Sequence, residues 1–245
     1  MTNDQKPVIS VRKLRKVYMM GQEHVVALHN IDLDIPRGEV CCIFGTSGSG
    51  KSTLLNQLAG LEKPTRGVVH IGGVPISRLN ENQLAAFRQK HIGFVFQSYN
   101  LLPELTAAEN VAMPLMFKGV DPDVRLLEAK KMLCRVGLKD RMDHFPNQMS
   151  GGQQQRVGIA RAFITQPEVV FADEPTGNLD TRTTKEVMHM IRGFAHRFHQ
   201  TIVLVSHDPE MTEYADRIVT LIDGRIVSNV ENQVKAEIDA APYIE

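Results

Sequence analysis

The chain has 245 residues, of which 42% are hydrophobic and 23% charged, which is ordinary for a soluble protein. Its 28 basic residues balance 28 acidic ones, so the sequence lacks the basic excess typical of nucleic-acid binding, and we expect no nucleic-acid partner. No stretch approaches the ~20 apolar residues that span a bilayer, and the first ten residues lack the apolar core of a signal peptide. Cys41, Cys42 and Cys134 have no metal-binding spacing, and the first two lie in an apolar run that predicts buried thiols.

Short apolar runs rich in β-branched residues recur along the chain and predict strands. They are Val8–Val11, Val40–Phe44, Val68–Ile71, Ile92–Phe96, Val169–Ala172, Ile202–Ser206 and Ile218–Ile222. Strands that are apolar on both faces, with helical stretches between several of them, predict a largely parallel sheet covered by helices. Gly72-Gly73 and Asp223-Gly224 each separate two such runs and predict hairpins, so some antiparallel sheet should accompany the parallel core.

A glycine-rich loop follows the strand predicted at Val40–Phe44 and precedes Leu54–Ala59, which has a helical pattern. Its residues fit the G-x-x-x-x-G-K-[ST] pattern of loops that bind nucleotide phosphates, and they are Gly45, Thr46, Ser47, Gly48, Ser49, Gly50, Lys51, Ser52 and Thr53. Glycines let backbone N–H groups curl around phosphate oxygens, and the helix that follows points its positive end at the same anion. Lys51 is predicted to contact the terminal phosphates and Ser52 to ligate Mg²⁺. We therefore predict ATP and Mg²⁺ as the bound groups.

The middle of the chain, about residues 100–165, is rich in helix formers and interrupted by prolines, and we expect a helical lobe inserted into the α/β core. Ser150, Gly151, Gly152 and Gln153 open its last helical stretch. Ser is a good N-cap and the glycines let a phosphate approach the helix, although a plain helix cap beside a polar turn is an alternative. The polar tail, residues 228–245, is expected to be a peripheral helix or disordered.

Two carboxylates, Asp173 and Glu174, follow directly on the strand predicted at Val169–Ala172. Alone, they would suit a solvated strand end. Ligands gather at the carboxyl ends of parallel strands, so with a phosphate loop in the chain we predict that Asp173 and Ser52 share one Mg²⁺. Glu174 is then the candidate general base beside the attacking water.

The order of phosphate loop, Gln97, SGGQQQR, VVFADE, NLD and His207 resembles the nucleotide-binding subunit of ATP-binding cassette (ABC) transporters. The resemblance covers about Val8 to Val227. It implies a P-loop NTPase (RecA-like) α/β core with an antiparallel β subdomain and an inserted helical subdomain, in one cassette over residues 1–227. It also implies an ATPase.

The resemblance also assigns roles to single residues. Tyr18 is implied to stack on adenine, although it would also suit an ordinary edge strand. Gln97 is implied to sense Mg²⁺ and water, with a surface amide as the alternative. Asp180 is implied to lie in a loop that crosses to a partner site, and His207 to contact the γ-phosphate as a switch. Ser150 and Gly152 are implied to hold the ATP of a second copy, so the resemblance implies a head-to-tail homodimer.

Several stretches resemble the MacB/LolD-type subgroup, among them FQSYNLLPELTAAENVAMPL and ADEPTGNLDT. Its members pair with a separate membrane subunit, which implies a location on the cytoplasmic face of a membrane. A helix of that subunit is expected in the cleft near Gln97–Leu105. A soluble ABC ATPase, such as one for iron–sulfur cluster assembly, stays open as an alternative. The chromosome type is disfavoured because Lys51 and Ser150 are too close in sequence for an inserted coiled coil, and the translation-factor type because the chain has one cassette.

Overall fold

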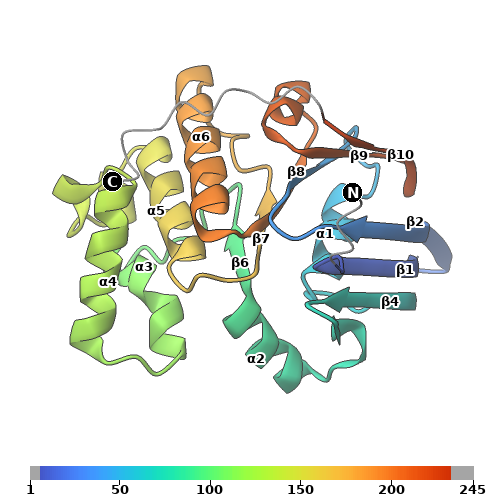
Figure 1. Cartoon of the computed structure of the whole chain (residues 1–245), viewed down its shortest axis with the longest axis horizontal. Helices are drawn as coiled ribbons and strands as arrows, with labels where there is room; N and C mark the ends of the chain where they lie inside the picture. Colours follow the sequence, from blue (N-terminus) through green and yellow to red (C-terminus); the bar gives the residue numbers. More distant parts are fainter. Residues whose placement is uncertain (1–5, 233–245) are drawn as a thin grey trace. The chain divides into compact units, whose positions relative to one another are not determined.

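The computed structural model of the chain describes residues 6–232, which divide into two compact units. One unit takes the chain up to Arg88 and again from Thr201, and the other takes Gln89–Gln200. The division falls within helix α2 (Glu81–His91). Figure 1 labels the helices and strands of both units.

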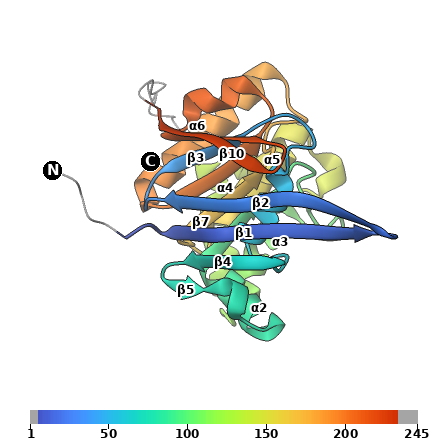
Figure 2. The same cartoon turned by 90° about the vertical axis from the view of Figure 1, so that its right-hand side faces the viewer.

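An antiparallel sheet forms one part of the first unit. Its strand order is β2-β1-β4-β5, with the bounds β1 Ile9–Met20, β2 Glu23–Ile35, β4 Arg66–Ile71 and β5 Val74–Pro75. Strand β1 lies between β2 and β4, as Figure 2 shows. Beyond Arg15, β1 pairs only with β2, because β4 begins at that level. The predicted turn at Gly72-Gly73 joins β4 to β5 as an antiparallel pair and is confirmed.

A mixed set of strands forms the other part of the first unit, in the order β10-β9-β3-β8. Their bounds are β3 Val40–Phe44, β8 Thr201–Ser206, β9 Arg217–Ile222 and β10 Arg225–Glu231. Strand β3 pairs in parallel with both β8 and β9, and the predicted turn at Asp223-Gly224 joins β9 to the antiparallel β10. Cys41 and Cys42 on β3 are fully buried as predicted, and burial raises the pKa of Cys42 to about 12. Cys134 is exposed.

The second unit joins two parallel strands to helices. The strands are β6 (Ile92–Val95) and β7 (Val169–Asp173), and the helices are α3 (Ala107–Phe117), α4 (Pro122–Arg135), α5 (Gly151–Phe163) and α6 (Thr181–Phe198). In α6 the buried residues recur every three or four positions, as in Thr184, Val187, Met188 and Ile191, because one face of the helix is packed and the other is solvated. Every regular element within 107–163 is helical, as the composition indicated.

Short elements complete the described chain. They are α1 (Lys51–Leu58) and the 3₁₀ turns η1 (Ile76–Arg78), η2 (Lys139–Arg141), η3 (Pro146–Gln148) and η4 (Pro209–Tyr214). None of the helices within residues 6–232 is long and apolar enough to cross a membrane.

The structure departs from the sequence expectations in three places. Strand β2 was not predicted, because its apolar residues alternate with polar ones and do not form a continuous run. Helix α1 begins at Lys51, so Lys51 and Ser52 lie in its first turn and not in the loop before it. Strand β10 continues to Glu231, so the start of the tail expected to be helical or disordered is strand. The rest of that tail lies outside the described residues, and the division into one cassette and a tail stays a prediction.

Candidate nucleotide site and its relatives

The phosphate loop connects β3 to α1 inside the first unit. Gly50, the N-cap of α1, has φ 99°, and a Cβ there would lie 2.7 Å from the carbonyl oxygen of Ala27. A Cβ at Gly45 would lie 2.3 Å from the carbonyl oxygen of Leu221. Both positions therefore require glycine, one for its left-handed backbone and both for the close approach of neighbouring strands. The helix start has no side-chain cap, which leaves its first N–H groups available to an anion.

Two polar groups lie buried at this loop. Lys51 is 6% exposed and its ammonium donates to the carbonyl oxygen of Thr46 at 2.8 Å. Ser49 is 2% exposed, and among the described residues its hydroxyl has no hydrogen-bond partner. A buried cation and a buried unsatisfied hydroxyl are costly unless a ligand uses them. The loop therefore fits the phosphates of a nucleotide.

His207 leaves β8 beside the phosphate loop. Strands β3 and β8 are parallel neighbours in which Phe44 pairs with Ser206, so Gly45 and His207 both follow the carboxyl ends of adjacent strands. His207 is exposed, and the Ser206 hydroxyl accepts a hydrogen bond from the backbone N–H of Asp208 just beyond it. The sequence prediction that His207 lies at the phosphate edge of the sheet agrees with this register, while its contact with a γ-phosphate stays a prediction.

Tyr18 lies on the part of β1 that pairs with β2 alone, and its phenol is tied to the loop after α1. The hydroxyl donates to Glu62 Oε2 at 2.7 Å, and the Thr53 side chain makes a second hydrogen bond to it. Burial, together with the bond to Glu62, raises the pKa of Tyr18, so the ring is a neutral, partly exposed aromatic surface. Such a surface suits a base-stacking role. Glu62 was missed by sequence reasoning because it belongs to none of the motifs and is 44 positions from Tyr18 in the sequence.

In the second unit, Gln97 and Glu174 lie in one cluster after the neighbouring strands β6 and β7. Asn178 Nδ2 donates to the carbonyl oxygen of Gln97 at 3.1 Å, and the N–H of Gly177 donates to the carbonyl oxygen of Glu174 at 3.1 Å. A Cβ at Gly177 would lie 2.8 Å from Gln97 Nε2. The backbone carbonyls of Gln97 and Glu174 are therefore linked through the segment Gly177-Asn178 within this unit, while the roles of both side chains stay predictions.

Glu174 has an unusual backbone. Its φ is 43°, a left-handed conformation that a non-glycine residue adopts at a cost, and Pro175 follows it. A proline restricts the residue before it further. Strain of this kind at an acidic residue after a buried strand is typical of a functional position, which supports the prediction that Glu174 is the general base.

The segment around Ser150 forms a complete helix start. The Ser150 hydroxyl accepts from the N–H of Gln153 at 3.3 Å, and Gln153 Oε1 accepts from the N–H of Ser150 at 3.0 Å. A Cβ at Gly151 would lie 2.8 Å from the Tyr99 hydroxyl, and one at Gly152 would lie 2.7 Å from a methyl carbon of Thr183. The plain helix cap that the sequence left open is therefore present, and any side chain at either glycine would have to displace the Tyr99 hydroxyl or the Thr183 methyl group.

Asp180 caps α6 in the same way. Its carboxylate accepts from the N–H and the hydroxyl of Thr183, both at 2.9 Å. The hydrogen bond from that backbone N–H, with the one from the Thr183 hydroxyl, lowers the pKa of Asp180. The residue predicted to face a partner site thus also fixes the start of α6.

The segment after Gln97 is fastened to α5. Tyr99 and Asn100 have φ angles of 61° and 47°. Arg161 donates to the carbonyl oxygens of both, at 2.7 and 2.6 Å. Burial lowers the pKa of Arg161, and the two carbonyls supply the partners that its guanidinium needs. Tyr99 therefore joins the Gln97 segment to the helix start at Gly151, a link that local sequence patterns did not indicate.

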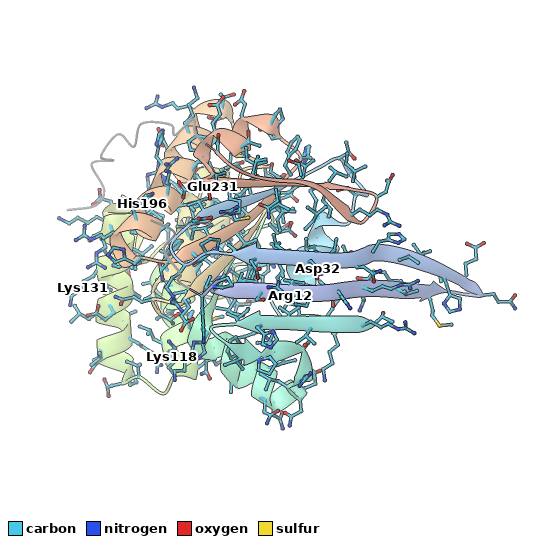
Figure 3. The ribbon with its side chains drawn as sticks, turned by 45° about the vertical axis from the view of Figure 1, so that its right-hand side comes forward. Arg12, Asp32, Lys118, Lys131, His196 and Glu231 are labelled. Atoms are coloured by element: carbon cyan, nitrogen blue, oxygen red, sulfur yellow. The ribbon has the colours of Figure 1, made fainter. Side chains whose placement is uncertain are left out.

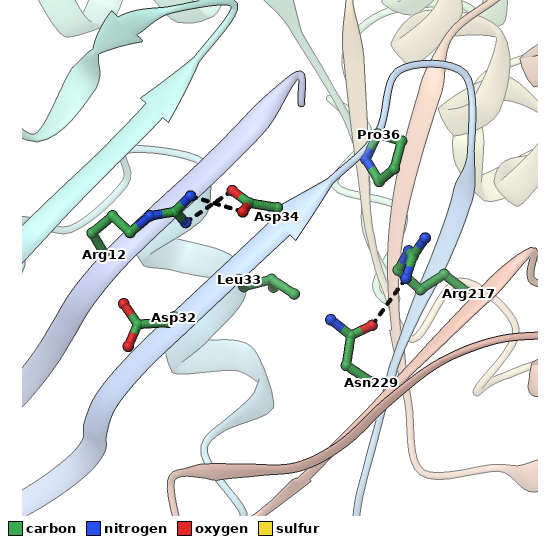
Figure 4. A pocket seen from close by; sticks show the side chains of 7 residues that line it. All are labelled: Arg12, Asp32, Leu33, Asp34, Pro36, Arg217 and Asn229. Atoms are coloured by element: carbon green, nitrogen blue, oxygen red, sulfur yellow. Dashed lines mark hydrogen bonds and ion pairs between the residues drawn. The ribbon is translucent and has the colours of Figure 1, made fainter. Parts of the chain in front are cut away.

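The first unit also has a pocket of about 650 Å³, whose charged side chains already have hydrogen-bond partners (Figure 4). Arg12 on β1 holds Asp34 on β2 with two hydrogen bonds of 2.8 and 2.7 Å, and Arg217 donates to Glu39 at 2.9 Å. Asp32, labelled with Arg12 in Figure 3, accepts from the backbone N–H of Lys13. Because Arg12 and Asp34 pair with each other, Arg217 pairs with Glu39 and Asp32 accepts a backbone N–H, we assign no ionic ligand to this pocket.

Comparison with known proteins identifies the family. Residues 28–177 match the family described as ABC transporter. The chain belongs to the ABC transporter ATP-binding family. It is 48% identical over 220 residues to an uncharacterized ABC transporter ATP-binding protein of Methanocaldococcus jannaschii, covering 90% of this chain and 98% of the relative. It is 44% identical over 223 residues to the macrolide export ATP-binding/permease protein MacB of Escherichia coli, covering 91% of this chain but only 34% of MacB.

A solved structure agrees with the fold. The ATP-binding cassette MJ0796, in a dimeric post-hydrolysis state bound to ADP and Pi, superposes with a TM-score of 0.85 at 40% identity, covering 91% of this chain and 98% of that one. The predicted P-loop NTPase fold is confirmed, and this ABC cassette is an ATPase. The relatives also confirm the resemblance to MacB-type cassettes.

Proposed function

We propose that this ABC ATPase closes on ATP as a homodimer and powers a separate membrane subunit of the MacB/LolD type from the cytoplasmic face of the membrane. Two findings support the transporter role over a soluble role in iron–sulfur cluster assembly. MacB itself joins a cassette like this one to a permease. The second unit also carries an open apolar groove directly after Gln97, which gives the proposed partner a place to bind.

In the proposed reaction, Lys51 and the N–H groups at the start of α1 hold the terminal phosphates, where negative charge grows as the bond between the γ-phosphorus and the bridging oxygen breaks. Glu174 accepts the proton of the attacking water. His207 contacts the γ-phosphate from the end of β8. Asp180 lies toward the partner, and Ser150 and Gly152 of each copy complete the site of the other.

Mg²⁺ is proposed to be held by Ser52, Asp173 and Gln97 together with the phosphates, and it would neutralise phosphate charge. Within residues 6–232 no three His, Cys, Asp or Glu side chains gather into a metal cluster. A site with few protein ligands is typical of Mg²⁺, which takes one or two protein carboxylates and completes its coordination shell with substrate phosphates and water. It disfavours a protein-caged metal.

The groove for the membrane subunit has a volume of about 480 Å³ and is mainly apolar. Leu102, Met116 and Phe117 on its rim are 44%, 43% and 62% exposed. The remaining lining residues are Leu105, Glu109, Ala112, Met113, Pro122, Asp123, Arg125 and Leu126. A mainly apolar groove that is also lined by charged residues suits the side chains of an amphipathic helix. We assign this groove to a helix of the membrane subunit.

The groove is built on a fixed loop. Asn110 is fully buried, and its amide bonds the N–H and carbonyl of Leu102 and the carbonyls of Leu105 and Thr106. Arg161 holds the preceding turn at Tyr99 and Asn100. A displacement of the groove would therefore be transmitted to Gln97 and to the helix start at Ser150 through these hydrogen-bonded segments. This is the proposed route from hydrolysis to the membrane subunit.

The groove assignment is tested by co-expression with the membrane protein encoded beside this chain. We expect Leu102→Glu and Phe117→Glu to weaken co-purification in detergent by about tenfold or more, because each places a charge where an apolar anchor should sit. Leu127→Glu is the matched control, since Leu127 is 54% exposed on α4 but does not line the groove. Basal ATP hydrolysis should be the same in all three.

Two outcomes would count against the proposal. If the groove variants co-purify as well as the control, the helix binds elsewhere. If the neighbouring genes encode soluble scaffold proteins and no membrane protein with a large extracytoplasmic domain, the soluble alternative gains.

A further inference from the structure

Glu62 is the centre of a small polar cluster behind Tyr18. Its Oε2 accepts from the Tyr18 hydroxyl at 2.7 Å and pairs with the Lys16 ammonium at 3.0 Å. Its Oε1 accepts from Asn56 Nδ2 at 3.1 Å. Burial acts to raise the pKa of Glu62, but the hydrogen bonds from Tyr18, Lys16 and Asn56 outweigh it and the pKa is lowered. The Glu62 carboxylate is therefore an ionised acceptor whose two oxygens bond these three side chains.

The cluster ties the aromatic ring to the phosphate loop. Asn56 lies on α1, the helix that begins at Lys51, and the N–H of Glu62 donates to the carbonyl oxygen of Asn56 at 3.3 Å. The loop after Glu62 also bonds β1, since the N–H of Val17 donates to the Thr65 hydroxyl at 3.0 Å. Tyr18 thus has a position set relative to α1 by Glu62 and Asn56, which lie outside the phosphate motif, as well as by Thr53 within it.

Lys16 distinguishes the two faces of the Tyr18 ring. Its ammonium lies 5.0 Å from the ring centroid, which is a cation–π distance, and it also donates to the carbonyl oxygen of Lys63 at 2.9 Å. The Lys16 side chain is only 14% exposed, so it is held over that face. A base can stack only on the face that Lys16 leaves open.

We propose that Glu62 is a positioning residue for adenine: it fixes Tyr18 and Lys16 so that one face of the ring is presented to the base at the distance set by the phosphate loop. Glu62 acts through Tyr18 and does not touch the nucleotide. This rests on the proposed role of Tyr18 in stacking adenine and extends it to the residue that orients the ring.

The test compares a ligand that has a base with one that lacks it. Dissociation constants of ATP and of inorganic triphosphate, both with Mg²⁺, are measured for the full chain by calorimetry. We expect Glu62→Ala and Tyr18→Phe each to weaken ATP binding by about three- to tenfold, the range for losing a well-oriented aromatic contact, and to leave triphosphate binding within about twofold. Glu62→Gln retains an acceptor for the phenol and should recover most of the affinity for ATP.

Controls separate the positioning role of Glu62 from the adenine-stacking role of Tyr18 on which it rests. Glu81→Ala, an exposed carboxylate paired with Lys63 in the same region, should change neither ligand. In a Tyr18→Ala background, Glu62→Ala should add no further loss for ATP. If Tyr18→Ala binds ATP normally, the adenine role of Tyr18 itself fails. If Tyr18→Ala is impaired but Glu62→Ala and Tyr18→Phe bind ATP normally, only the positioning role is overturned.

Two further results would also overturn it. An equal loss for triphosphate and ATP in Glu62→Ala would indicate a general disturbance of α1. A full additional loss for ATP in the Tyr18→Ala background would indicate that Glu62 contacts the nucleotide directly. Tyr18→Phe removes only the phenol oxygen, so it keeps the test valid should Glu62→Ala fold poorly.

Discussion

Single residues show how a short motif becomes a site. Lys51 was predicted to contact phosphate from the pattern alone. The structure adds that Lys51 is buried and that its ammonium donates a hydrogen bond to the carbonyl oxygen of Thr46. Within the described residues no carboxylate pairs with it. The charge of Lys51 is therefore available to a phosphate. We expect that removing this side chain first weakens ATP binding and only through that lowers turnover.

We expect Lys51→Ala to weaken ATP binding by about a hundredfold, because a charge-assisted contact to phosphate in a partly desolvated site is worth about 1.5–3 kcal/mol and is lost outright. Calorimetric titration measures this directly. Lys131→Ala is the control, since that lysine lies on α4 in an exposed pair with Glu128 (Figure 3). Wild-type affinity in Lys51→Ala would contradict the assignment.

The phosphate loop could be predicted because its chemistry is local: nine consecutive residues fix both the backbone and the charge. The support of Tyr18 could not, because Glu62 is 44 positions away and is only one of many surface acids until the fold places it. The same holds for Tyr99 and Arg161, which are 62 positions apart. Contacts set by tertiary packing leave no spacing signal in one sequence.

At the scale of elements, buried parallel strands were the easiest to predict. Strands β3 and β8 are buried almost throughout, so each is a continuous apolar run. Strand β2 has one face in solvent along its second half, and the resulting alternation was overlooked. The start of α1 was placed three residues late because Lys51, Ser52 and Thr53 are polar and resemble loop residues.

The loop before α3 offers a stability test of the groove. We expect Asn110→Ala to lower the free energy of unfolding by about 2–4 kcal/mol, because it removes the side-chain hydrogen bonds to the Leu102 N–H and the Leu105 carbonyl and leaves a cavity at a fully buried position. Thr106→Ala removes the capping box of α3 and should cost about 1 kcal/mol. Chemical denaturation measures both. An Asn110→Ala protein no less stable than Thr106→Ala would show that the loop does not depend on this amide.

At the scale of the whole molecule, the proposed function requires two copies of the chain. The nucleotide-holding residues Lys51 and Ser52 and the helix start at Ser150 are proposed to serve different ATP molecules. No arginine finger is apparent in the sequence, and the N-terminus of α5 is the proposed source of positive potential for the γ-phosphate in its place. In this proposal ATP binding drives closure of the two copies and hydrolysis releases them. The sequence could indicate this dimer only through its resemblance to a family, because no local pattern in one chain shows which residues of two copies meet.

The central claim is tested most directly by the mass of Glu174→Gln in solution, measured by light scattering after size exclusion. The substitution keeps the shape of the side chain but removes the base, so ATP should bind and persist. We expect a mass twice that of the monomer with ATP and a monomer without it, and a return to monomer when Ser150→Arg is added. A Glu174→Gln protein that hydrolyses ATP at the normal rate, or that stays monomeric at saturating ATP, would contradict the account.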